Sequence, residues 1–239
     1  MSLFVKSAEM AYGEQAALAG VLAGLRPQLS LELGTFTGGS LVHIAAHSRE
    51  VHSFDLASHR TETLPNVSYH LGDSRVTVPA LLDRLTAERR SVDFVLVDAD
   101  HSRAGVERDM INLLRSPALE RTVLLVHDCA NEGVREGVRN AILRAGDVAY
   151  ADLSFVVATG ASSLLAESWG GLGMVVVDRT GDLWKLDRGV LDNVHWPTGH
   201  RRSLAWRALR PARAVKRELM YQVRPAYRRI FGSRGEKLG

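Results

Sequence analysis

Short apolar runs recur along the chain as far as residue 178, and longer amphipathic stretches lie between them. Runs that are apolar throughout are typical of strands buried on both faces of a parallel sheet. Apolar residues repeated every three or four positions predict helices. Strands that alternate with helices predict an α/β fold with a doubly wound, mostly parallel sheet. The predicted strands are 29–32, 51–55, 67–72, 92–97, 122–126, 154–159 and 173–178, and the predicted helices are 7–25, 39–47, 76–85, 102–114 and 131–142.

The same pattern predicts three parts of the chain. Residues 1–27 form an N-terminal helix that covers the site, with Ser7 as its cap, and 12–15 interrupt its apolar stripe as a solvated turn. Residues 28–187 hold the sheet. Residues 188–239 form a basic helical extension broken by prolines.

A glycine-rich turn follows the first predicted strand. This strand ends in Glu32, the turn runs from Gly34 to Gly39, and a helix begins there. Glycines permit a tight bend close to a ligand, and the free N–H groups of a helix start bind anionic groups. A nucleotide-like ligand is therefore expected here, although the turn lacks the G-x-G-x-x-G spacing of dinucleotide sites.

Acidic residues stand at the ends of the later strands. Asp55 follows Gly34 by 21 residues, where a carboxylate accepts hydrogen bonds from the two hydroxyls of a ribose. Asp73 either accepts a hydrogen bond from the ligand or caps the next helix. Asp98 and Asp128 end the fourth and fifth strands, and His101 lies three residues beyond Asp98.

Composition narrows the class of protein. Of the 239 residues, 46% are hydrophobic and 24% are charged, the balance of a soluble globular protein. The start lacks a signal-peptide pattern and no long apolar run occurs, so we expect a cytoplasmic protein. Cys129 is the only cysteine, which excludes disulfides and thiolate zinc sites within one chain. Residues 201–239 contain 12 Lys and Arg against 2 Asp and Glu, so this basic tail is expected to meet an anionic surface.

The glycine turn and the acidic strand ends resemble class I S-adenosylmethionine-dependent methyltransferases, whose Rossmann-like sheet has seven strands and closes with an antiparallel pair. In that family an acidic residue closes the first strand, a place that Glu32 holds here. The resemblance implies S-adenosyl-L-methionine as the cofactor. The cofactor-binding residues that it implies are Glu32, Gly34, Thr35, Gly38, Ser40, Asp55, Gly72, Asp73, Ser74 and Asp98.

The ends of strands four and five resemble the metal-dependent O-methyltransferases. If these strands are neighbours, Asp98 and Asp128 repel one another unless a cation such as Mg²⁺ or Mn²⁺ lies between them. The family's third ligand place is Cys129, a poor Mg²⁺ ligand, so Asn131 is the expected donor. The Asp-x-x-His pattern resembles the sugar O-methyltransferases and implies His101 as general base, whereas the catechol type uses lysine. We interpret His127 as a packed residue rather than a ligand.

These features predict a Mg²⁺-dependent O-methyltransferase, expected as a homo-oligomer, that acts on a hydroxyl of a sugar, glycoside or polysaccharide. It is similar to the methylmannose polysaccharide 1-O-methyltransferases. A natural-product or catechol-type acceptor is the alternative. An NAD-dependent oxidoreductase would leave Asp98 and Asp128 unexplained, and a membrane- or polyanion-binding module would use the basic tail alone. A nucleic-acid partner is not expected, because amino-directed enzymes carry two prolines after strand four and VDADHS has none.

Overall fold

The structure is a computed structural model that describes residues 9–58, 63–145, 147–157, 161–162 and 167–181. The chain divides into two units, Met1–Val194 and His195–Gly239, and every described residue belongs to the first. Ser7 and the basic extension therefore lie outside the described residues. The described helices are α1 (Tyr12–Leu25), α2 (Gly39–His47), α3 (Ser74–Ala87), α4 (Arg103–Arg115) and α5 (Glu132–Ala145). The strands are β1 (Leu29–Leu33), β2 (Glu50–Asp55), β3 (Val67–Leu71), β4 (Phe94–Val97), β5 (Arg121–His127), β6 (Val148–Val156), β7 (Ala161–Ser162), β8 (Glu167–Ser168) and β9 (Leu172–Asp178).

Seven strands form one sheet in the order β3-β2-β1-β4-β5-β9-β6. Neighbours from β3 to β5 are parallel, and β9 is antiparallel to both β5 and β6. The order reverses at β1, which lies between β2 and β4. Ligands of such sheets bind beyond the carboxyl ends of the strands at this point. The sequence prediction of a seven-stranded, mostly parallel, Rossmann-like sheet is confirmed.

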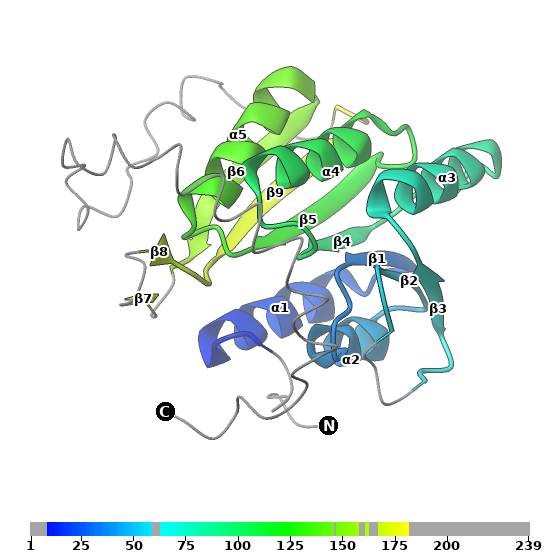
Figure 1. Ribbon diagram of the computed structural model, residues 1–239. Coiled ribbons are helices and arrows are strands. Elements are labelled where there is room, and N and C mark those ends of the chain that lie inside the picture. The colour runs from blue at the N-terminus through cyan, green and yellow to red at the C-terminus, as the bar shows by residue number, and fades with distance from the viewer. Residues whose placement is uncertain (1–8, 59–62, 146, 158–160, 163–166, 182–239) are drawn as a thin grey trace. The chain divides into compact units, whose positions relative to one another are not determined.

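Helices cover both faces of the sheet, α1 and α2 on one and α3, α4 and α5 on the other (Figure 1). Successive residues of a strand point to opposite faces. In β4, Phe94 and Leu96 pack in the core cluster of α1 and α2, while Val95 and Val97 pack with α3, α4 and α5. Both faces are buried, which explains why this strand is apolar at every position.

The ends of most elements match the sequence prediction. Helix α2 spans the predicted 39–47, and Ser102 caps α4 by accepting a hydrogen bond from the Gly105 N–H. Two elements differ. Helix α1 begins at Tyr12 rather than at residue 7, and strand β6 begins at Val148 rather than at residue 154. The segment between β6 and β9 also contains the short antiparallel pair β7 and β8. No helix among the described residues is long and apolar enough to cross a membrane.

Candidate active site

The β1–α2 turn is built against the end of β4. Gly34 has a φ of 93°, and a Cβ placed on it would lie 2.2 Å from the carbonyl oxygen of Asp98. Glycine is therefore required here by the neighbouring strand itself. Gly38, with a φ of 85°, precedes the first turn of α2. The turn between them brings its backbone to the edge of the sheet where β1 and β4 end.

Glu32 is fully buried beneath this turn. Its carboxyl group accepts hydrogen bonds from Ser40 Oγ at 2.7 Å and from Ser53 Oγ at 2.8 Å. Burial raises the pKa of Glu32 to about 8, although the two hydroxyls act in the opposite direction. Glu32 thus ties β1 to the start of α2 and to β2. It shapes the predicted cofactor turn from below, and Ser40, also predicted there, is its partner.

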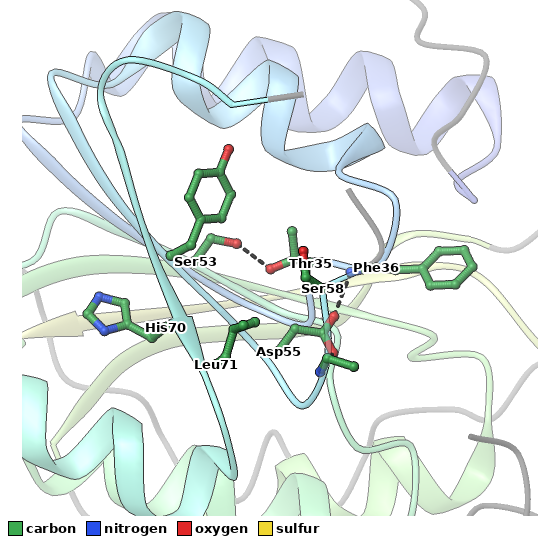
Figure 2. Close-up of a pocket in the computed structure, with 9 residues that line it drawn as sticks. Thr35, Phe36, Ser53, Asp55, Ser58, His70 and Leu71 are labelled. Carbon is green, nitrogen blue, oxygen red and sulfur yellow. Dashed lines mark hydrogen bonds between the residues drawn. The ribbon is translucent and has the colours of Figure 1, made fainter. Parts of the chain in front are cut away.

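A pocket opens beside the turn at the ends of β2 and β3 (Figure 2). Asp55 Oδ2 accepts a hydrogen bond from the Phe36 N–H at 2.7 Å, and Thr35 Oγ1 is bonded to Ser53 Oγ. Phe36 has a φ of 46°, unusual for a bulky residue and a conformation often found at functional sites. A carboxylate has about four acceptor positions, so Asp55 keeps capacity for ribose hydroxyls. The pocket is lined by Thr35, Phe36, Ser53, Asp55, Ala57, Ser58, Tyr69, His70 and Leu71.

The third predicted cofactor loop, Gly72–Ser74, joins β3 to α3. Asp73 caps α3 by accepting a hydrogen bond from the Arg75 N–H at 2.9 Å, and it forms an ion pair with the Arg75 side chain. Arg75 lowers the pKa of Asp73. Of the two roles that the sequence left open, the structure shows the cap. Ser74 Oγ donates to Asp109 Oδ1 on α4 at 3.1 Å.

Asp98 and Asp128 end the neighbouring strands β4 and β5, whose register pairs Val97 with Val126. Two imidazoles lie between the carboxylates. His101 Nε2 is 3.1 Å from Asp98 Oδ1 and 3.4 Å from Asp128 Oδ2. His127 Nδ1 is 3.1 Å from Asp98 Oδ1 and 3.7 Å from Asp128 Oδ2. The structure therefore brings His101, Asp98 and Asp128 together as predicted, and adds His127.

Charge holds this cluster together. Burial alone would raise the pKa of Asp98, but the charge of His127 and the hydrogen bonds of both histidines lower it. Burial would lower the pKa of His101 and of His127, yet Asp98 raises both, that of His127 well above its usual value. The two carboxylates thus favour the charged forms of both imidazoles, and the imidazoles favour the charged form of Asp98. Asp128 also has a φ of 58°, a strained conformation of the kind found at functional sites.

Glu14 reaches the cluster from α1, which contradicts the interpretation of 12–15 as a solvated turn. Its side chain is 3% exposed, and Oε2 lies 3.3 Å from His127 Nε2. Sequence reasoning missed it, although a signal was present. Glu14 precedes Leu18 and Leu22 at intervals of four, so it continues the buried stripe of the helix.

Asn131, predicted as the third metal ligand, opens α5. Its Oδ1 accepts a hydrogen bond from the Gly133 N–H at 2.9 Å, so this oxygen is engaged at the helix start. Ligand atoms of Asp98, His127 and Asp128, in contrast, lie within 4.8 Å of one another. Cys129 is buried, and burial raises the pKa of its thiol to about 12, which disfavours the thiolate that a metal needs.

A segment before β9 closes the cluster on another side. The Gly170 N–H donates to Asp128 Oδ1, and the Gly171 N–H donates to Glu14 Oε1. The ring of Trp169 meets His101 edge to face, with centroids 5.8 Å apart. The sequence pattern did not single out Trp169. The wall beside His101 is thus aromatic.

A family model described as a methyltransferase domain matches residues 31–129, which run from β1 to the end of β5 and include the glycine turn, Asp98 and Asp128. No curated protein matches the chain significantly in sequence. The family match coincides with the segment that holds most of the predicted site.

Solved structures share the fold. The O-methyltransferase from Bacillus cereus in complex with SAH has a TM-score of 0.52 at 16% identity, over 73% of this chain and 84% of that chain. TomG from Streptomyces achromogenes, an O-methyltransferase of tomaymycin synthesis in complex with SAM, has a TM-score of 0.52 at 18% identity, over 71% of this chain and 81% of that chain. MycE of the mycinamycin pathway, in complex with Mg, SAH and mycinamycin VI, has a TM-score of 0.51 at 14% identity, over 74% of this chain and 52% of that chain. At identities of 14–18%, these likenesses show the fold, a Rossmann-like sheet.

Proposed function

We propose that this protein transfers a methyl group from S-adenosylmethionine to a hydroxyl of a sugar, glycoside or polysaccharide, with a divalent cation and with His101 as general base. The observation that carries the proposal is the cluster of two carboxylates and two imidazoles at the ends of β4 and β5. It adjoins the glycine turn, because Gly34 packs on Asp98. A cofactor bound at the turn and His101 as base would therefore lie at the same edge of the sheet.

The cofactor would occupy the turn and the pocket beside it. Asp55 would accept the ribose hydroxyls, and the Gly72–Ser74 loop would meet the adenine. Glu32 and Ser40 would hold the turn from beneath, as their hydrogen bond indicates. SAM or SAH in the neighbours from Bacillus cereus and Streptomyces achromogenes supports this cofactor over NAD.

The cluster fits a divalent cation. Two carboxylate oxygens suit Mg²⁺ and Mn²⁺, and the imidazole of His127 completes a set of three within 4.8 Å. We therefore propose Asp98, His127 and Asp128 as ligands, with His127 in the role first predicted for Asn131. An imidazole nitrogen favours Mn²⁺ over Mg²⁺ in such a set. The Mg in the complex of MycE supports a cation in this fold.

Methyl transfer requires one proton acceptor. The acceptor oxygen attacks the methyl carbon, the bond from carbon to the sulfonium breaks, and its electrons return to sulfur as S-adenosylhomocysteine leaves. The hydroxyl proton passes to the neutral imidazole of His101. Asp98 raises the pKa of His101 and so favours the charged form, which cannot accept a proton. A cation at Asp98 and Asp128 would supply the compensating charge that leaves His101 neutral.

The side chain beside His101 bears on the acceptor class. The aromatic ring of Trp169 beside His101 suits a sugar ring, whose C–H groups pack on aromatic faces. A natural-product hydroxyl is the second candidate, because TomG acts in tomaymycin synthesis and MycE binds mycinamycin VI.

Labelled S-adenosylmethionine tests the proposal on a panel of methyl glycosides, mannose oligosaccharides and catechol. We expect label in a glycoside, loss of transfer in EDTA, and recovery with Mn²⁺ or Mg²⁺. Asp98→Ala and Asp128→Ala should each abolish transfer. Full transfer in EDTA would refute the metal, and label in catechol alone would refute the sugar acceptor.

A further inference from the structure

The side chain of Glu14 has no part in the mechanism above, yet it is the carboxylate of α1 that enters the cluster. A buried ionised carboxylate is costly unless hydrogen bonds and opposite charge compensate it. Glu14 has both, because Oε2 accepts from the Ala11 N–H at 2.6 Å and lies 3.3 Å from His127 Nε2. Oε1 accepts from the Gly171 N–H.

A role confined to the helix end does not account for these contacts. The bond to Ala11 spans three residues and could form at the surface, as such bonds do in many helices. The contacts with His127 and Gly171 join residues 113 and 157 positions apart and bury the carboxylate. These distant contacts are the ones that place Glu14 in the cluster.

His127 has two ring nitrogens, and Glu14 decides which one faces the carboxylates. With Nε2 directed to Glu14, Nδ1 lies 3.1 Å from Asp98 Oδ1 and 3.7 Å from Asp128 Oδ2. A carboxylate on the far nitrogen of a ligating histidine fixes its tautomer and ring orientation. Glu14 is placed to do this for His127.

The same carboxylate fastens the segment that carries Trp169. Gly170 and Gly171 have φ values of 84° and 79°, a left-handed pair that glycine adopts without strain. Their successive N–H groups point to Asp128 and to Glu14. The segment is therefore held at one end by a proposed metal ligand and at the other by α1.

We propose that Glu14 is a positioning residue of the active site, which orients His127 for the cation and fixes the Trp169–Gly171 segment against the cluster. The inference rests on the proposed function. It makes cation capture depend on the opening helix, since the Glu14 carboxylate of α1 contacts both His127 and Gly171.

Glu14→Gln tests this role, because glutamine has the same size but offers one acceptor oxygen in place of two. Glu9→Gln is the matched control, since Glu9 is exposed and close by in sequence. Mn²⁺ affinity would be measured by electron paramagnetic resonance, and S-adenosylhomocysteine affinity by calorimetry. We expect the Kd for Mn²⁺ to rise about 10- to 100-fold in Glu14→Gln alone, as for other partners of ligating histidines. Cofactor affinity should stay within about twofold, because the pocket at Asp55 is untouched.

Equal Mn²⁺ affinity in Glu14→Gln and the wild type would overturn the role of Glu14 and leave the proposed function standing. If the wild type bound neither Mn²⁺ nor Mg²⁺, both the positioning role of Glu14 and the proposed metal site would be overturned. Methyl transfer in the presence of EDTA would show independently that the metal site is absent. Long-range ¹H–¹⁵N spectra of the Mg²⁺-loaded wild type need no variant that must fold. They should show His127 protonated at Nε2 and not at Nδ1, and the opposite tautomer would overturn the inference.

Discussion

Replacing Gly34 by alanine should destabilise the fold far more than the same change at Gly38. Both residues have left-handed φ values, 93° and 85°. Strain in an L-residue costs about 1–2 kcal/mol there, and the loss of unfolded-state entropy returns about 0.4–1 kcal/mol. Gly38→Ala has no heavy atom within 4 Å of its new Cβ, so its net cost should be about 1 kcal/mol.

Gly34→Ala adds a steric conflict to this strain. Its Cβ would lie 2.2 Å from the carbonyl oxygen and 2.6 Å from the carbonyl carbon of Asp98. These are backbone atoms at the end of a buried strand, so they cannot move aside as a side chain could. Overpacking costs about 1–3 kcal/mol, which brings the total for Gly34→Ala to about 2–4 kcal/mol.

Urea denaturation of the two variants and the wild type measures the difference. The displaced Asp98 should also weaken S-adenosylhomocysteine binding and, where the cation binds, Mn²⁺ binding. If Gly34→Ala unfolded at the same urea concentration as Gly38→Ala, the close contact between Gly34 and the Asp98 backbone would be contradicted. Position 34 would then not require glycine.

Two other predictions concern the site. Asp55→Ala should weaken S-adenosylhomocysteine by about 1.5–3 kcal/mol, the cost of losing a charged hydrogen-bond partner, and unchanged affinity in calorimetry would remove Asp55 from the site. His101→Ala should lower kcat by about 10²- to 10⁴-fold with cofactor affinity nearly intact. A variant that kept more than about a tenth of the wild-type kcat would exclude His101 as the general base.

Local sequence was sufficient for the sheet and for the strand-end acids. Strand β4 is apolar at every position because both of its faces are covered, and a strand of this kind can be recognised without knowing its neighbours. The glycines of the β1–α2 turn mark the bend, and the acids follow where the apolar runs stop. Asp98, Asp128 and His101 could therefore be named together.

Contacts between residues far apart in the chain could not be predicted from local sequence. Glu14 has a charged side chain, which local sequence alone predicts to be exposed. It is buried because His127 and the Gly171 N–H, both far along the chain, compensate its charge. The start of β6 was missed because Ala149 and Ala151 are small, while Tyr150 between them is exposed. Pairing with β9, rather than local pattern, makes this segment a strand.

The last prediction concerns Asp109, which supports the Gly72–Ser74 loop through Ser74. It is 3% exposed, and its Oδ2 has no hydrogen-bond partner among the described residues. Burial raises the pKa of Asp109 from 3.8 to about 6, and the charges of Asp100 and Asp73 add to this. Well below pH 3.8 the Asp109 carboxyl group is protonated in both the folded and the unfolded state, so its burial does not lower the stability of the wild type.

As the pH rises through this interval, the unfolded chain ionises first and the folded state loses stability relative to it. The loss approaches about 3 kcal/mol above pH 6, since each unit of pKa difference corresponds to about 1.4 kcal/mol. Asp109→Asn removes the titration, so the stability of the variant relative to the wild type should rise by about 2–3 kcal/mol between pH 3.5 and pH 7.5. Asp83→Asn, at an exposed position of α3, is the matched control. Urea denaturation at both pH values provides the comparison, and a difference that did not change with pH would mean that Asp109 is ionised in the fold and anchors Ser74 as a charged acceptor.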